Sequence, residues 1–234
     1  GSPNRAALAS ALGDALAQRR VLLWSANDPT QAAILEAGLG GSLAVPEGHH
    51  VAFAAINSSG SKLDAFLERS LTYTVGRCPD PDTDRVVSSV DIALVNAIPE
   101  GADVPEYMIS LAERGPDGPI NSTLAQVYLP LGAQVLEVTV DGESSSYITF
   151  REQDRPAVLL DLDLPPREVR TVTVEFSEPA ADGPGSAPQQ PLGSEQVTTI
   201  VDGDCTTVSP EAVDGDERLD PADDPLGPLV EITD

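Results

Sequence analysis

The chain has 234 residues, of which 38 are acidic and 13 are basic, so its formal net charge is −25. This charge argues against nucleic acid or an anionic membrane surface as a partner, because both repel an acidic protein. Hydrophobic residues make up 41% of the chain and aromatic residues only 4%, so aliphatic side chains must fill most of the core.

A helix–strand–helix element opens the chain, over residues 1–44. Residues 5–20 carry alanine and leucine at helical spacing, residues 21–25 are a short apolar run of strand type, and residues 27–38 predict a second helix. We interpret this element as the tail of an upstream domain, packed on the domain that follows. Trp24 is expected to act as the packing anchor between them.

From about Val51 the pattern changes from helical spacing to alternation of apolar and polar residues, with turn residues between the runs. Strands are expected at residues 51–56, 69–77, 86–98, 124–130, 133–141, 147–151, 157–164, 169–177 and 196–201. Strands of this number, with no helical pattern between them, predict a mainly β fold, an antiparallel Ig-like β-sandwich over residues 45–207.

Two later segments have little apolar content. Residues 180–194 are rich in proline, glycine, glutamine and serine, which predicts a loop. Residues 208–234 are acidic and rich in proline, and we expect them to form a disordered tail because they cannot bury a core of their own.

The two cysteines, Cys78 and Cys205, lack a CxxC spacing and a flanking histidine that would suggest a metal site. Each lies in a polar segment rich in proline and aspartate, where a buried thiol would be out of place. We therefore expect a disulfide, which is typical of extracellular proteins. Two unpaired buried thiols are the alternative.

Lys62 is the only lysine of the chain and lies in a turn-rich stretch, residues 57–64. We expect it to have a structural role with Asn57 and Asp64, through an ion pair or a backbone contact that holds this turn. An isopeptide bond is an alternative, which would need a buried lysine with a lowered pKa. Ser59 and Lys62 also match the S-x-x-K nucleophile motif of serine β-lactamases, although the partner motif K-T-G needs a second lysine.

Metal ligands are poorly represented. Asp80, Asp82 and Asp84 alternate like the first ligands of a calcium loop, but an arginine stands where an EF-hand needs glycine, so we expect a solvated loop. His49 and His50 are the only histidines and point apart if they lie in a strand. The sequence thus predicts no metal and no cofactor.

Several motifs resemble, in the same order, a known family. Residues 17–26 (Ala-Gln-Arg-Arg-Val-Leu-Leu-Trp-Ser-Ala), residues 57–64 (Asn-Ser-Ser-Gly-Ser-Lys-Leu-Asp) and residues 67–70 (Leu-Glu-Arg-Ser) resemble the C-terminal half of actinobacterial proteins in the domain-of-unknown-function family 4012. The strand at residues 126–130 is similar to the closing part of that family. The resemblance covers about residues 5–207 and implies an envelope-anchored protein with a larger upstream region, without an established activity.

Residues and resemblance together predict an extracellular, non-catalytic module of an actinobacterial cell-envelope protein, with an envelope glycan or protein as a candidate partner. Contact with a membrane is expected only through segments outside this sequence, which would anchor the full-length protein. One alternative is the accessory half of a cell-wall glycopolymer-processing protein of the LytR–CpsA–Psr type, whose active site lies upstream. A weaker alternative is a serine hydrolase that acts through Ser59 and Lys62.

Overall fold

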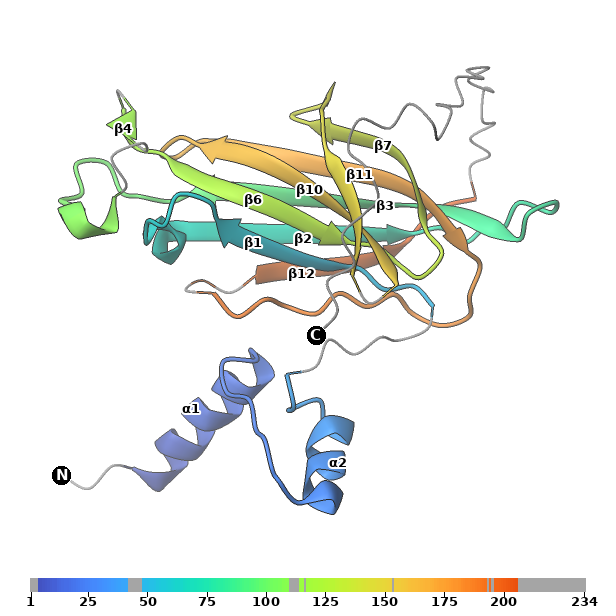
Figure 1. The fold of residues 1–234 in the computed structure, drawn as a ribbon, viewed down its shortest axis with the longest axis horizontal. Helices are drawn as coiled ribbons and strands as arrows, with labels where there is room; N and C mark the ends of the chain where they lie inside the picture. Colours follow the sequence, from blue (N-terminus) through green and yellow to red (C-terminus); the bar gives the residue numbers. More distant parts are fainter. Residues whose placement is uncertain are drawn as a thin grey trace, which may run out of the picture.

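The computed structural model describes residues 4–41, 48–109, 114–115, 117–152, 154–192, 194 and 196–205, and it shows a mainly β protein (Figure 1). The helices are α1 (Arg5–Ala17) and α2 (Asp28–Glu36), and two short 3-10 turns are η1 (Leu63–Phe66) and η2 (Glu106–Met108). The strands are β1 (Ala52–Asn57), β2 (Leu67–Val75), β3 (Arg85–Asn96), β4 (Arg114–Gly115), β5 (Gly118–Pro119), β6 (Asn121–Tyr128), β7 (Gln134–Val140), β8 (Glu143–Ser144), β9 (Ile148–Glu152), β10 (Arg155–Leu164), β11 (Val169–Pro179) and β12 (Gln196–Asp202).

The strands form two main layers. One sheet has the order β1-β6-β10-β9 and the other has the order β12-β2-β3-β11-β7-β8, which confirms the predicted β-sandwich. The sheets are not wholly antiparallel as predicted, because β12 pairs with β2 in parallel. After β11 the chain returns along one side of the sandwich before β12 begins, so β12 runs in the same direction as β11 (Figure 1).

The core lies between the two layers and follows from the period of two along each strand. In β2 the residues Leu67, Leu71, Tyr73 and Val75 are at most 1% exposed, and the residues between them are more exposed, apart from Arg69. Burial of each aliphatic side chain of this kind stabilises the fold by about 1.5–3 kcal/mol. The layers are therefore held together mainly by aliphatic packing.

Residues 180–192, which we call the strap, run along the outer edge of β1. The backbone of Ser186 accepts from the N–H of Val51 (3.0 Å) and donates to the carbonyl of His49 (3.0 Å). Further along, the side-chain amide of Gln190 accepts from the N–H of Ala55 (2.8 Å) and donates to its carbonyl (3.1 Å). The predicted loop thus covers a sheet edge that would otherwise expose unpaired backbone groups.

The helical element at the start of the chain differs from its prediction. Residues 21–25 form no strand, and their backbone contact is the bond from the N–H of Leu23 to the carbonyl of Leu39 (2.9 Å). An apolar run forms a strand only when it can pair with the edge of a sheet, and the strap already occupies the edge of β1. Among the described residues, neither helix is long and apolar enough to cross a membrane.

Trp24 is 79% exposed, so the prediction that it anchors the helical element on the sandwich is wrong. Leu22 lines a small pocket together with residues of β1 and the strap. In a strand, the side chains of residues 22 and 24 would point to the same face. Because the backbone at residues 21–25 is irregular, the two side chains need not point the same way. The predicted tail at residues 208–234 lies outside the described residues.

Candidate functional site

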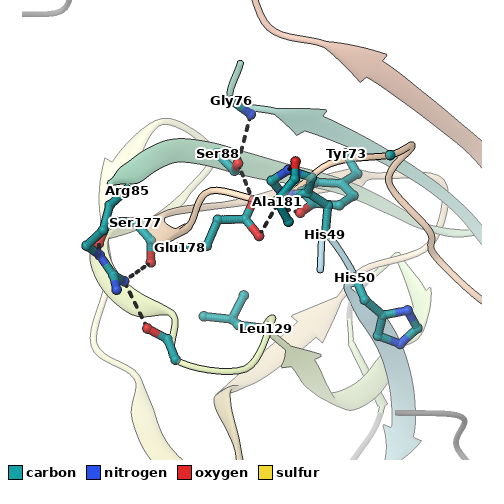
Figure 2. Close-up of polar contacts among 12 residues, drawn as sticks. His49, His50, Tyr73, Gly76, Arg85, Ser88, Leu129, Ser177, Glu178 and Ala181 are labelled. Atoms are coloured by element: carbon teal, nitrogen blue, oxygen red, sulfur yellow. Dashed lines mark hydrogen bonds and ion pairs between the residues drawn. The ribbon is translucent and has the colours of Figure 1, made fainter. Parts of the chain in front are cut away.

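A cluster of polar side chains lies inside the sandwich, centred on Glu178 near the end of β11 (Figure 2). Glu178 is 0% exposed and lies beside Tyr73 of β2, Ser88 of β3 and His49, which precedes β1. Even-numbered residues of β11 face the core, and continued alternation places this carboxylate there. Four separate segments therefore supply the cluster.

Glu178 is bonded through both carboxylate oxygens. Its Oε1 accepts from the hydroxyl of Tyr73 (2.8 Å) and from the hydroxyl of Ser88 (2.5 Å), while Ser88 Oγ accepts from the N–H of Gly76 (2.9 Å). Its Oε2 lies 3.0 Å from His49 Nδ1, and both of these side chains are 1% exposed. Apart from this short contact, neither of those two atoms has a hydrogen-bond partner among the described residues.

The contacts of His49 distinguish its two ring nitrogens. His49 Nε2 lies 3.0 Å from the carbonyl oxygen of Ala181, and because a carbonyl only accepts, Nε2 carries the hydrogen. The other ring nitrogen, Nδ1, faces Glu178 Oε2.

The surroundings of the cluster keep Tyr73 a hydrogen-bond donor and offset the cost of burying Glu178. Burial and the neighbouring Glu178 raise the pKa of Tyr73, so its hydroxyl remains a donor. A buried carboxylate without partners would cost several kcal/mol, and the contacts with Tyr73, Ser88 and His49 offset this cost.

Serine, histidine and a carboxylate are the residue types of a catalytic triad, in which the histidine lies between the other two. Here the order of contacts differs. Glu178 lies between Ser88 and His49, so Ser88 donates to the carboxylate and not to the imidazole. The cluster is closed to solvent, because Glu178, Ser88 and Tyr73 are at most 1% exposed and His49 is 5% exposed. The arrangement joins β2, β3, β11 and the strap through buried polar contacts.

Sequence reasoning did not find Glu178, although a signal was present. The strand was expected to end at residue 177, and alternation continued past that point would have placed an acid at a core position. Nothing in the sequence indicated that Tyr73, Ser88 and His49 are its partners, because they lie 90 to 129 residues before Glu178 in the chain.

His50 points away from Glu178, as the period of a strand requires for adjacent residues (Figure 2). Its Nδ1 lies 2.7 Å from the hydroxyl of Ser186 in the strap, and the residue is 5% exposed. Burial, with a smaller effect of the Arg155 charge, lowers the pKa of His50 to about 4. His50 is therefore neutral at pH 7.

Lys62 is exposed, and its Nζ lies 4.9 Å from the ring centroid of Tyr107, a cation–π contact. Its backbone N–H donates to the carbonyl of Met108 (3.0 Å), the kind of backbone contact that was expected. An isopeptide bond needs a buried amine, which Lys62 does not provide.

The turn at residues 57–64 is organised by side chains other than Lys62. Asn57 donates to Ser61 Oγ (2.8 Å) and accepts from Ser59 Oγ (3.3 Å), while Asp64 accepts from Asn121 (3.3 Å). Ser59 Oγ therefore donates to an asparagine, while the Lys62 amine lies over the ring of Tyr107.

Cys78 and Cys205 form the predicted disulfide, with Cα atoms 5.4 Å apart. It lies just beyond the ends of β2 and β12. Nearby, Arg77 forms an ion pair with Asp202 (2.5 Å), and the N–H of Gly203 donates to the carbonyl of Val75 (2.7 Å). These contacts fix the end of β12 to β2.

The aspartates at 80–84 lie in the connection between β2 and β3. Asp80 Oδ1 accepts from the N–H of Asp82 (3.0 Å), and from the N–H (2.9 Å) and hydroxyl (3.0 Å) of Thr83. These bonds, chiefly the one from the Thr83 hydroxyl, lower the pKa of Asp80. The carboxylate thus caps its own turn, and the described residues contain no group of three or more candidate metal ligands.

Fold and cluster together define a two-layer β protein with a closed, polar interior site. No protein-family model matches the sequence, and the search of curated proteins found no match. Among solved structures, the chain is distantly similar to a Legionella pneumophila protein described as a "putative nutrient binding protein". The identity is 12% and the TM-score 0.31, and the match covers 56% of this chain and 43% of that one.

Proposed function

We propose that this chain is an extracellular, non-catalytic β-sandwich module of a cell-envelope protein, with a structural or binding role. The observation that carries the proposal is the closed cluster around Glu178. The cluster uses Ser88 and His49 in internal contacts, and both histidines of the chain are only 5% exposed. Groups that perform acid–base chemistry must reach a substrate, and these groups face one another.

The compartment is proposed from the disulfide between Cys78 and Cys205. Disulfides persist in oxidising environments and are rare in the cytosol. A bridge that closes a loop of this length contributes about 5 kcal/mol by restricting the unfolded chain. The place in the cell envelope is proposed from the sequence resemblance over about residues 5–207.

Ser59 is the remaining serine of interest for a hydrolase. Its hydroxyl donates to Asn57, while the amine of Lys62 lies over the ring of Tyr107. A lysine can activate a serine only when the amine is within hydrogen-bond reach of the hydroxyl. This geometry favours a structural turn over a nucleophile.

Labelling with a fluorophosphonate, which reacts with base-activated serines, tests the non-catalytic part of the proposal. We expect the intact mass to remain unchanged under conditions that fully label trypsin. The matched variant Ser59→Ala should give the same result. An adduct on the wild-type chain that disappears in Ser59→Ala, or one mapped to Ser88, would contradict the proposal.

A further inference from the structure

The larger sheet ends in the edge strand β12, whose sequence differs from that of the other edges (Figure 1). The strap covers the edge of β1, β9 carries Arg151 and Glu152, and β8 is only two residues long. Natural proteins block sheet edges with such charges, short strands or covering segments, because an open edge pairs with other strands. β12 has seven residues, Gln-Val-Thr-Thr-Ile-Val-Asp, with no proline and no charge before Asp202. Its composition therefore favours pairing.

The backbone of β12 presents donors and acceptors on its outer side. The N–H of Gly203, just past the strand, donates to the carbonyl of Val75 in β2 (2.7 Å). Successive residues of a strand direct their backbone groups to opposite sides, so those of Gln196 and of every second residue up to Asp202 point away from β2. Within the described part of the chain, no backbone hydrogen bond reaches these groups, and residues 197–202 are exposed. The outer side of β12 is thus ready to extend the sheet.

The side chains of β12 are uncharged and apolar for a strand of so acidic a protein. The chain has a net charge of −25, yet the only charged side chain of β12 is Asp202, which forms an ion pair with Arg77. Val197, Ile200 and Val201 are 65%, 39% and 40% exposed. Side chains branched at Cβ are favoured in strand pairs, and covering their apolar surface is favourable. Charge repulsion at this edge is therefore small, and there is apolar surface to bury.

We propose that β12 pairs with the β12 of a second copy of this chain, antiparallel about a two-fold axis through Thr199. The axis places Val197 opposite Val201 and Thr199 opposite its own counterpart, so that like, uncharged side chains meet. It also places Thr198 opposite Ile200, and the backbone groups of both point away from β2, as an antiparallel ladder requires. A two-fold interface must be complementary to itself, and this strand meets that condition. The pairing goes beyond the proposed function, which a single copy can fulfil.

Sedimentation equilibrium of the full chain measures the association. Because a single strand edge makes a small interface, we expect the average mass to rise from 24.4 kDa toward twice that value between about 10 µM and 1 mM. Salt should strengthen the association, because two chains of net charge −25 repel each other and about 0.15 M salt screens exposed charges beyond about 8 Å. A mass that stays at 24.4 kDa over this range, in low and in high salt, would overturn the inference.

A proline on the outer side of β12 tests the interface directly. Thr198→Pro removes an N–H that points away from β2, and proline is tolerated on an edge strand in such a place, so circular dichroism should show an unchanged fold. The association should weaken at least about tenfold, because both copies lose this hydrogen bond. Thr198→Val keeps the N–H and a branched side chain, and it should associate like the wild type. Equal association of Thr198→Pro and the wild type would contradict the interface.

Cysteine variants test the register and leave the backbone unchanged. Residues opposite each other in a pair without mutual hydrogen bonds have Cα atoms about 4.5 Å apart, within reach of a disulfide. Thr199→Cys should therefore form a disulfide-linked dimer under mild oxidation, whereas Val197→Cys and Val201→Cys should cross-link efficiently only when mixed. Thr149→Cys, exposed on the edge strand β9, is the control and should remain monomeric. No cross-link in Thr199→Cys, or one no more efficient than in Thr149→Cys, would overturn the inference.

Discussion

Glu178 is an acid at a position where the strand pattern calls for an apolar side chain, and its partners explain how the fold tolerates it. Tyr73 and Ser88 donate to one oxygen, and His49 faces the other. Each partner is itself buried and needs the carboxylate in turn. Loss of the carboxylate would therefore leave three buried polar groups unsatisfied, which costs more than loss of a surface contact.

Replacement of Glu178 tests this account of the cluster. Glu178→Ala should lower the free energy of unfolding by about 3–5 kcal/mol, because it removes the shared partner of three buried side chains. Glu178→Gln should cost clearly less, since its carbonyl accepts from Tyr73 and Ser88 and its amide donates to His49 Nδ1. Urea unfolding of the three proteins measures both effects. Equal, small losses for the two variants would show that the cluster contributes little.

At His50, the free energy of unfolding is expected to depend on pH. Its pKa of about 4 in the folded state lies below the ordinary value of 6.5, so the unfolded chain binds a proton at a higher pH than the folded protein does. Stability should be complete above pH 6.5 and fall as the pH drops toward 4, by about 3 kcal/mol from this residue.

The variant His50→Gln isolates this contribution. It cannot titrate, so the loss of stability between pH 6.5 and pH 4 should be smaller than in the wild type by about 3 kcal/mol. Chemical unfolding at a series of pH values measures the difference between the two curves, in which the carboxylates common to both proteins cancel. Parallel curves over this range would contradict the role given to His50.

At the scale of elements, the strap joins β1, the edge strand of one sheet, to β2 of the other. Gln190 bonds to the backbone of Ala55 in β1, and Arg69 of β2 donates to the Gln190 carbonyl (3.2 Å) and side chain (3.3 Å). Ser194, just beyond the strap, accepts from the same arginine (3.0 Å). A segment without regular structure thus completes one side of the sandwich.

Neighbouring glutamines provide a matched test of the strap. Gln190→Ala should lower the free energy of unfolding by about 1–3 kcal/mol, because it leaves the buried backbone groups of Ala55 and part of Arg69 without partners. Gln189→Ala should change it by less than about 0.5 kcal/mol, since Gln189 lines the pocket and not the edge of β1. Thermal and urea unfolding of both variants measure this. Similar losses for the two would mean that the Gln190 bonds are not responsible.

At the scale of the whole molecule, several polar groups are buried between the layers or under the strap. Both histidines, the buried hydroxyls and Glu178 face the core or the strap, and the disulfide fixes β12 to β2.

Strand positions could be predicted from the sequence because one buried sheet face repeats every two residues, as in Leu71, Tyr73 and Val75. The disulfide could also be predicted, since the polar surroundings of Cys78 and Cys205 disfavour free buried thiols. The parallel pairing of β12 could not, because it depends on the path of the strap. The Glu178 cluster depends on contacts between distant segments, which no local pattern records.

The measurement that tests the central claim most directly is the reaction of the two histidines with diethyl pyrocarbonate, which acylates accessible imidazoles. His49 and His50 are the only histidines, so mass spectrometry reports on them without interference from others. We predict that neither is modified in the folded protein at a concentration that modifies both in urea, because both are 5% exposed. Modification of His49 in the folded protein at the rate seen in urea would show that the cluster is open to solvent, and would contradict a closed, non-catalytic interior.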